Sequence, residues 1–485
     1  LAAGISPVGH PSFLCAAAAA GHTEVAILLL DAGASPSASI PKGTCCLMAA
    51  CEGGHHSMVQ LLLQRGANPA HRTHNGMSCL CVACQRGYAE VVRLLVQAGA
   101  PVNEEAVTGV NRSLLCLCAH EGHTAVAQEL IAGGADVNAT GTNGVTALYI
   151  AARKGHVSMV ECLLQAGALP DLAKDGGFTP LFVAASYGHV FVVELLVRWG
   201  VNIDMRAHNG FSPLSIAAQD GHSMVVERLL YYGADVGAAQ RAGATPLYIA
   251  ARKGHESVVT LLVAAGVDLF QRKKGGYTCL HAASYNGHVS IVERILEAGL
   301  PVDVCSDTGL TSLHAACQKG HLSVVKALLR WGASLHLLTN DGKSSLFFAL
   351  WEKEESVVDY LLQQRPAPDI LQTLNAVLLH LSDHPDPLVL VRTVLYEIAY
   401  RLRDCEDLWA VAASSGPPSP SSSGSLRPTS LSIPAALLQF CLRSLYTILQ
   451  FPSPDILDPV EVLHFLVWLL QCSVVLLLPL SGISL

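Results

Sequence analysis

The feature that most constrains this sequence is a Gly-His pair that recurs along most of its 485 residues. The histidines of these pairs are His22, His55, His123, His156, His189, His222, His255, His288 and His321. The steps are 33 residues long, except that Tyr88 fills one gap and the step from Tyr88 to His123 is 35 residues. A constant period of this length indicates a stack of repeated units rather than a single globular core.

A second motif runs ten residues ahead of the Gly-His pair and keeps the same period. It reads T-A-L-Y from Thr146, T-P-L-F from Thr179, S-P-L-S from Ser212, T-P-L-Y from Thr245, T-C-L-H from Thr278 and T-S-L-H from Thr311. Its Thr or Ser is suited to begin a short helix as the N-cap residue. Proline suits the first helical position, where a missing N–H has little effect, and it occurs there at Pro180, Pro213 and Pro246.

Each unit can therefore be interpreted as a turn followed by two short helices. Asn-Gly or Asp-Gly pairs, which tolerate the positive φ of tight turns, occur at Asn75, Asn143, Asn209 and Asp341. The glycine of the Gly-His pair is expected to end the first helix, as at Gly188, Gly221 and Gly254. Apolar residues at helical spacing, such as Val258, Val259 and Leu262, predict the second helix.

Stacking of these units explains an unusual composition. The chain is 51% hydrophobic and 14% charged, whereas a typical soluble protein is about 25% charged. Two short helices cannot bury their apolar faces alone, so neighbouring units must cover one another. The hydrophobic content excludes a mainly disordered chain, and the net charge of −8 argues against a basic nucleic-acid-binding surface. The 16 cysteines are too few for a disulfide scaffold and permit a reduced, intracellular protein.

Together the signals give T-P-L-x-x-A-A-x-x-G-H-x-x-V-V-x-x-L-L-x-x-G-A, which resembles the ankyrin repeat. The resemblance extends from Ser12 to Gln364 and comprises ten repeats and a degenerate eleventh, in which Glu354 replaces the histidine and Trp351 and Lys353 break the small-residue pattern. It implies an all-α fold: a solenoid of helix-turn-helix pairs with β-hairpin fingers, followed by a few C-terminal helices. It also implies a non-enzymatic protein that binds partner proteins.

Three patterns that imitate chemical sites have structural explanations. The histidines lie one repeat apart, and we expect each to form a hydrogen bond within its own loop, because a metal site needs several converging ligands. Cys79, Cys81 and Cys84 occupy positions that hold Pro, Phe and Ala in another repeat, which predicts core cysteines. Gly342-Lys343-Ser344-Ser345 resembles the end of a phosphate-binding loop, but no strand precedes it. We therefore expect no catalytic residue, metal, cofactor or small-molecule ligand.

The resemblance places variable, exposed positions at the finger tips, just before the T-P-L motif and just before Gly-His. These positions hold basic and aromatic residues, the usual anchors of interfaces. We predict that they bind a partner protein: Arg153, Lys154, Phe178, Tyr187, Arg206, Phe211, Arg241, Arg252, Lys253, Lys273, Lys274, Tyr277, Tyr285 and Lys319.

Acidic residues collect instead on the second helices and are expected to face outward, at Glu161, Glu194, Glu227 and Glu293. The inner face of repeats five to ten is thus expected to be basic and aromatic in a chain that is acidic overall. We hypothesise that this face binds an acidic or phosphorylated segment of another protein. The alternatives are ordinary solvated side chains and, with less support, single-stranded nucleic acid.

The repeat array is predicted to occupy residues 1–365 and to end before Pro366 and Pro368. Amphipathic helices over residues 366–411 are expected to cap it. Residues 412–432 are rich in Ser, Pro and Gly and predict a disordered linker, and residues 433–485 predict an apolar helical segment. Because the sequence starts with Leu1 rather than Met, we expect a missing N-terminus.

Two motifs in the last segment leave alternatives open. Leu437 and Cys441 fit L-x-x-x-C-x-x-x-Φ, which resembles the elongin-binding start of a SOCS box; an ordinary amphipathic helix also fits. Residues 462–480 are long enough for a marginal membrane span, and a buried helix is the other interpretation. The leading prediction is a cytoplasmic scaffold or adaptor, with nuclear or membrane-associated locations left open. The alternatives are a substrate receptor of a cullin–elongin ubiquitin ligase and a tail-anchored scaffold.

Overall fold

The computed structural model describes residues 11–104 except 38, 41 and 42, residues 113–364, and the two positions Thr373 and Ala376. The chain divides into two compact units. Unit 1 comprises Leu1–Ala250 and Ser257–Val267, and unit 2 comprises Ala251–Glu256 and Asp268–Leu485. The described residues form helices without any extended strand, which confirms the all-α prediction.

Each repeat contributes a first helix and a second helix. The first helices of unit 1 are α1 (Pro11–Ala20), α3 (Cys46–Gly53), α5 (Cys79–Arg86), α7 (Leu114–Glu121), α9 (Ala147–Lys154), α11 (Pro180–Ser186) and α13 (Pro213–Asp220). Its second helices are α2 (Thr23–Asp31), α4 (His56–Gln64), α6 (Ala89–Gln97), α8 (Thr124–Ala132), α10 (Val157–Gln165), α12 (Val190–Arg198) and α14 (Ser223–Tyr231). The division between the units falls within α15 (Pro246–Lys253) and α16 (Glu256–Ala264).

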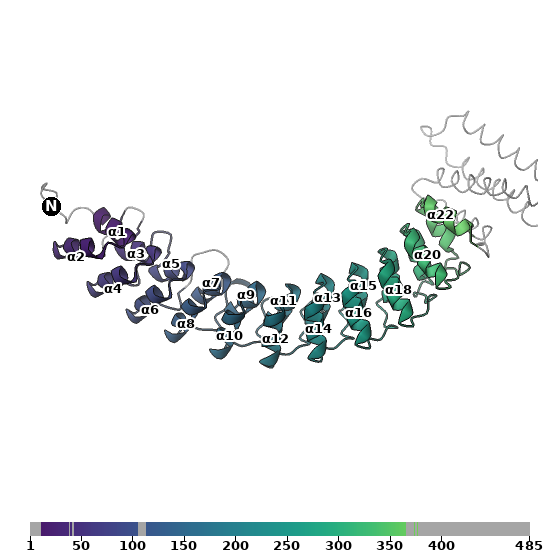
Figure 1. The fold of residues 1–485 in the computed structure, drawn as a ribbon, viewed down its shortest axis with the longest axis horizontal. Coiled ribbons are helices and arrows are strands. Elements are labelled where there is room, and N and C mark those ends of the chain that lie inside the picture. The colour runs from purple at the N-terminus through teal and green to yellow at the C-terminus, as the bar shows by residue number, and fades with distance from the viewer. Residues whose placement is uncertain are drawn as a thin grey trace, which may run out of the picture. The chain divides into compact units, whose positions relative to one another are not determined.

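Unit 2 continues the same alternation. Its first helices are α17 (Cys279–Tyr285), α19 (Ser312–Gln318) and α21 (Ser345–Trp351), and its second helices are α18 (Val289–Glu297), α20 (Leu322–Arg330) and α22 (Glu355–Leu362). Within each unit, every first helix packs on the next first helix and every second helix on the next second helix (Figure 1). The core therefore runs along the stack, as the periodicity predicts.

Local signals begin and end these helices as predicted. The Thr179 Oγ1 accepts a hydrogen bond from the Phe182 N–H at 3.1 Å, and Pro180 follows at the first helical position. In the next helix of the pair, Val192, Val193 and Leu196 are fully buried. The fingers are short hairpins, with isolated antiparallel bridges at Ser39–Cys45, Arg72–Ser78 and Lys174–Phe178.

The Asn-Gly and Asp-Gly turns differ from one another. Among the described residues, Asn143 and Lys353 are the non-glycine residues with positive φ, at 58° and 64°. At Asn75, Asn209 and Asp341 only the following glycine is left-handed. In these three turns the polar side chain bonds locally instead; the Asn209 Oδ1, for example, accepts the Phe211 N–H at 3.1 Å. The pair thus supplies a turn in each case, but by two conformations.

The histidine of the Gly-His pair joins two repeats, so the expected hydrogen bond within its own loop was wrong. The His189 Nε2 lies 2.9 Å from the Arg153 carbonyl oxygen of the preceding repeat, and His222 reaches the Ser186 carbonyl at 2.8 Å. A Cβ at Gly155, where φ is 79°, would lie 2.6 Å from the His189 ring. Glycine is required there both by its backbone conformation and by the approach of the next histidine. The glycine of one Gly-His pair meets the histidine of the next pair in the same way along the array, which explains why glycine and histidine recur together.

Beyond residue 364 the structure describes two positions of the predicted C-terminal part. Thr373 and Ala376 are helical and buried, and the Thr373 hydroxyl lies 2.7 Å from the Ser344 hydroxyl at the start of α21. The rest of the predicted cap at 366–411, the linker at 412–432 and the apolar segment at 433–485 lie outside the described residues. Within the part of the chain that the structure describes, no helix is long and apolar enough to cross a membrane.

Candidate protein-binding surface

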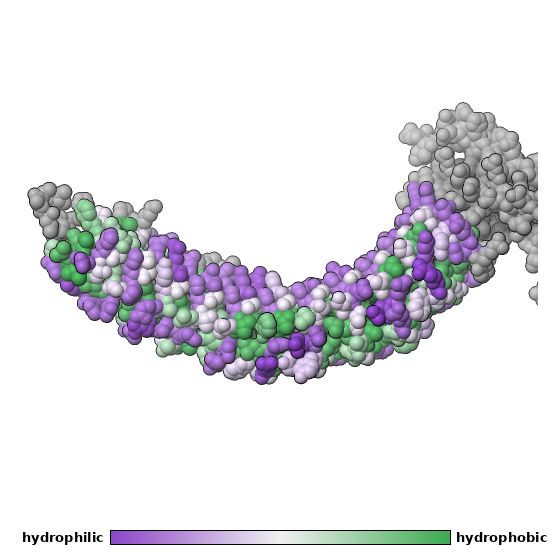
Figure 2. Space-filling view, in the orientation of Figure 1, coloured by the Kyte–Doolittle hydropathy of each residue, from purple (hydrophilic) through white to green (hydrophobic). Residues whose placement is uncertain are grey.

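In unit 1, Arg153 and Tyr187 form a stacked pair at the ends of first helices α9 and α11. The guanidinium carbon of Arg153 lies 5.5 Å from the ring centroid of Tyr187, and its Nε lies 3.3 Å from the tyrosine hydroxyl. Tyr187 is 51% exposed, and its other neighbour is the His189 ring, which stacks on it at 6.3 Å. The pair therefore presents a cation on an aromatic platform to solvent. Hydrophilic side chains predominate over the first helices α7, α9 and α11 in the space-filling view (Figure 2).

Lys174, in the finger ahead of α11, was not among the predicted site residues. Its ammonium nitrogen lies 5.4 Å from the ring centroids of both Tyr149 and Phe178. Phe178 is half-buried rather than exposed, because its ring also packs on Phe182 at 5.1 Å. The sequence signal that would reveal Lys174 is its place four residues before Phe178, directly opposite it in the finger hairpin.

The other predicted residues of unit 1 differ in their partners. Arg206 is exposed and donates to the Ala239 carbonyl at 2.8 Å, with Asp235 3.9 Å away. Phe211 is half-buried in its own finger. Lys154 and Arg241 are exposed, and no hydrogen bond or ion pair of their side chains occurs within the described residues. Two of these four side chains thus remain available to a partner as free cations.

An acidic residue also lies among the basic residues of unit 1. Asp220 at the end of α13 is exposed and accepts a hydrogen bond from the Ser186 hydroxyl at 2.9 Å. Sequence reasoning concentrated on basic and aromatic residues and did not include it. The surface of unit 1 is therefore mixed in charge, with cations at Arg153, Lys154, Lys174, Arg206 and Arg241 and an acid at Asp220.

In unit 2, three predicted residues are cations without partners. The side chains of Arg252, Lys253 and Lys274 form no ion pair or hydrogen bond with any residue that the structure describes. Lys253 and Lys274 are exposed and Arg252 is half-buried. Arg272 of the same finger donates to the Cys305 carbonyl at 3.3 Å, which fixes the finger to the next one. This finger is the most basic one in the described residues, since it carries Arg272, Lys273 and Lys274 in sequence.

Aromatic residues accompany these cations. The Lys319 ammonium lies 5.0 Å from the Tyr285 ring centroid, and a hydrogen bond with the tyrosine hydroxyl raises the pKa of Lys319. Tyr285 is 43% exposed. Tyr277 is half-buried and meets the His281 ring edge-on at 5.8 Å, and Lys273 is half-buried as well. The predicted aromatics just before the T-P-L motif thus lie partly inside their fingers.

The acidic residues of the second helices fall into two classes. Glu161 and Glu227 are exposed, as expected. Glu194 and Glu293 are half-buried and face an arginine of the following repeat, with Glu194 2.9 Å from Arg228 and Glu293 4.0 Å from Arg330. Each of these two glutamates therefore has an arginine partner in the next repeat, whereas Arg252 and Lys253 at the end of α15 have no carboxylate partner among the described residues.

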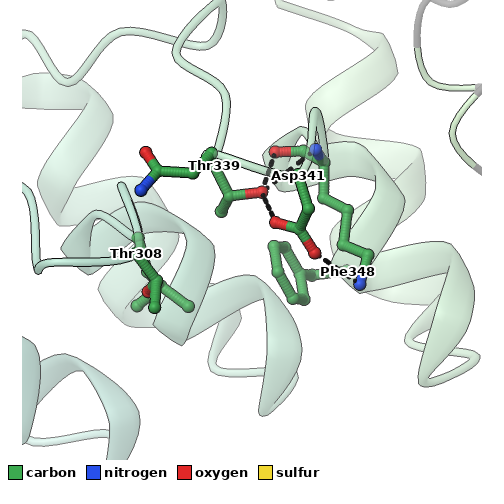
Figure 3. A pocket seen from close by; sticks show the side chains of 7 residues that line it. Thr308, Thr339, Asp341 and Phe348 are labelled. Atoms are coloured by element: carbon green, nitrogen blue, oxygen red, sulfur yellow. Dashed lines mark hydrogen bonds and ion pairs between the residues drawn. The ribbon is translucent and has the colours of Figure 1, made fainter. Parts of the chain in front are cut away.

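A groove in unit 2 lies between the fingers that precede α19 and α21 (Figure 3). It has a volume of about 490 Å³ and is lined by Thr308, Leu310, Thr339, Asn340, Asp341, Lys343 and Phe348. Lys343 lies 2.8 Å from the Asp341 carboxylate. Partial burial opposes ionisation of Asp341, but hydrogen bonds from Lys343 and Thr339 lower its pKa to about 2. The groove thus contains one ion pair and one aromatic ring.

Comparison with models of protein families identifies the type of repeat. The family model described as "Ankyrin repeats (3 copies)" matches residues 14–106, 115–207, 214–306 and 280–373, which is more than half of the chain. This chain belongs to the ankyrin repeat family.

Among solved structures, this chain is similar to the ankyrin repeat domain of human ASB11. The two are 28% identical with a TM-score of 0.42, and the match covers 44% of this chain and 96% of that one. A comparison with curated proteins found no match. Leu437 and Cys441, the residues of the SOCS-like motif, lie outside the described residues.

The cysteine prediction for the ankyrin core is confirmed. Cys79, Cys81 and Cys84 are all buried, with at most 1% of each side chain exposed. Within the part of the chain that the structure describes, no group of three or more His, Cys, Asp or Glu residues is placed to hold a metal ion.

Sequence reasoning missed one set of exposed residues in the ankyrin array. Phe191 and Met224 hold the same position of α12 and α14, and 73% and 54% of their surfaces are exposed. Ser158, Ser257 and Ser290 stand at this position in other repeats. Comparing the repeats column by column would have revealed this apolar pair.

Proposed function

We propose that this protein is a non-enzymatic scaffold or adaptor that binds an acidic or phosphorylated segment of a partner protein. The proposed binding residues are the basic and aromatic side chains at the ends of the first helices and in the fingers. The proposal rests on one observation: Arg252, Lys253 and Lys274 are unpaired within the described residues. Cations without carboxylate partners keep their full charge for a ligand.

The aromatic residues support the same proposal. Arg153 and Lys319 rest on tyrosine rings rather than on carboxylates. A ring orients a cation without neutralising it, so the cation can still pair with a carboxylate or phosphate of the partner. Tyrosine and arginine also lose little conformational entropy in an interface and are frequent hot spots.

The experiment measures binding of a fluorescent octaglutamate peptide to the full chain by anisotropy. Because exposed charges are screened by salt, we expect the affinity to fall between 50 and 200 mM salt, by about tenfold or more. The double variant Arg252→Glu/Lys253→Glu should weaken binding by about tenfold, because it reverses two free cations.

The matched control is Arg294→Glu/Arg330→Glu, which reverses two cations on the second helices of the same unit. Each of these arginines faces a glutamate, with Arg294 3.5 Å from Glu297 and Arg330 4.0 Å from Glu293. We expect this variant to retain at least half of the affinity. Equal losses in both double variants would mean that only the overall charge matters and would refute the assigned surface.

A further inference from the structure

Cysteines are concentrated in the first four repeats of unit 1. They occupy the first helices or their caps and are buried: Cys15, Cys45, Cys46, Cys51, Cys79, Cys81, Cys84, Cys116 and Cys118. All nine are reduced cysteines. Several face a cysteine of the adjacent repeat, including Cys45 with Cys79 and Cys84 with Cys118. The first helices therefore carry a row of thiols from one repeat to the next.

One pair in this row is in direct contact. The Sγ of Cys15 on α1 lies 2.9 Å from the Sγ of Cys46 on α3. These helices lie side by side at the beginning of the described chain (Figure 1). A disulfide bond is about 2.05 Å long, so the sulfurs need to approach by roughly 0.9 Å to bond. Side-chain movement of this size does not require separation of the helices.

The two thiols of this pair are not equivalent. The contact between the two thiols lowers the pKa of Cys15 and raises the pKa of Cys46. Cys15 is therefore the thiol that ionises first, and the thiolate is the nucleophilic form. Cys15 keeps 5% of its surface exposed, whereas Cys46 is fully buried, and Phe13 on α1 is 55% exposed.

We propose that Cys15 and Cys46 form a reversible disulfide that ties the first repeat to the second when a hydroperoxide oxidises the protein. The Cys15 thiolate attacks the peroxide oxygen, the O–O bond breaks, and hydroxide leaves to give a sulfenic acid on Cys15. The Cys46 sulfur then attacks the Cys15 sulfur, and the sulfenic oxygen leaves as water. In sum, two thiols and one hydrogen peroxide give one disulfide and two water molecules.

The consequence follows from the position of the pair in the array. Helices α1 and α2 pack against α3 and α4, and Val25 and Leu28 of α2 are 48% and 64% exposed. A helix pair with little cover opens locally more easily than the repeats inside the stack. A covalent link from α1 to α3 opposes this opening, so oxidation would stabilise this end of the array.

The test treats the full chain with hydrogen peroxide, alkylates the remaining thiols under denaturing conditions and identifies peptides by mass spectrometry. We expect a linked Cys15–Cys46 peptide that is two hydrogens lighter than the sum of its parts and that disappears on reduction with dithiothreitol. Hydrogen exchange of α1 and α2 should slow by about tenfold or more in the oxidised protein.

The controls separate this reaction from general oxidation. Cys84 and Cys118 are fully buried within the stack and should remain alkylatable under the same conditions. In Cys46→Ala, the Cys15 sulfenic acid should persist and react with dimedone. The proposal is wrong if Cys15 and Cys46 stay reduced while other cysteines oxidise, or if Cys84–Cys118 links form equally fast.

Discussion

Two junctions between repeats use different chemistry in this protein. In the middle of unit 1, His189 lies against Gly155 and bonds to the Arg153 carbonyl at 2.9 Å. In unit 2, Glu354 occupies the position of the histidine against Gly320, and Lys353, the residue before it, occupies that of the glycine with φ at 64°. The backbone keeps the left-handed conformation although its residue is not glycine. The comparison teaches that this turn keeps its left-handed conformation when another residue replaces glycine, and that a glutamate can take the place of the histidine against the glycine of the preceding repeat.

The first helices of the two regions differ as well. α11 and α13 in unit 1 begin with proline, whereas α17 and α19 in unit 2 begin with a capping box closed by a histidine. In the second of these, the His314 Nδ1 accepts the Thr311 N–H at 3.0 Å, so Nε2 carries the proton and donates to the Leu337 carbonyl at 3.1 Å. One neutral ring satisfies two backbone groups, but only while it stays neutral.

The largest expected effect comes from breaking a regular junction. Gly155→Ala places a Cβ 2.6 Å from the His189 ring and imposes an alanine on a φ of 79°. We expect the free energy of unfolding to fall by about 2–4 kcal/mol, from the left-handed backbone and the steric overlap together. Urea denaturation measures the loss.

Gly167→Ala is the matched control for this variant. Its φ is 88°, and no heavy atom lies within 4 Å of the added Cβ. It should lose only the backbone part, about 1–2 kcal/mol. Combining Gly155→Ala with His189→Ala should recover part of the loss, because the overlap disappears. Equal losses in the two glycine variants would show that the histidine contact is not what requires the glycine.

An intermediate effect is expected from acid. Burial lowers the pKa of His314 to about 4, below its ordinary value of 6.5. The folded state therefore disfavours the proton, so stability is complete above pH 6.5 and falls as the pH drops from 6.5 toward 4. We expect His314 to contribute a loss on the order of 2–3 kcal/mol over this range.

His314→Gln tests this dependence while keeping an acceptor in the capping box. The variant should show a shallower decline of stability between pH 6.5 and 4, measured by urea denaturation at several pH values. The variant His208→Gln, in an exposed finger of unit 1, should keep the slope of the original protein. An unchanged slope in His314→Gln would contradict the assignment.

The smallest effect is expected at Lys353 in unit 2. Lys353→Gly removes the strain of a non-glycine residue at φ 64° and adds conformational entropy to the unfolded chain. These terms partly cancel, and we expect a gain of about 0.5–1 kcal/mol, seen as slower hydrogen exchange in α22. Lys353→Ala, which keeps the strain, serves as the control and should show no gain.

Much of the fold could be predicted because repetition multiplies weak local signals. Thr179, Pro180 and Gly188 each predict a helix boundary only weakly, but the same boundary recurs at one period along the chain. The candidate surface was predicted less well. The positions of Arg153 and Tyr187 followed from the repeat register, but their stacking depends on side-chain rotamers, which the register does not contain.

The sequence by itself determined the repeat, its helix boundaries and the residue types at the exposed positions, because these depend on backbone preferences and apolar periodicity within one unit. Only the tertiary structure decided which unit each histidine bonds to, which cations remain unpaired and that Cys15 meets Cys46. All three are contacts between adjacent repeats. A periodic sequence predicts that neighbouring repeats stack, but the distances between their side chains are set only when the stack forms.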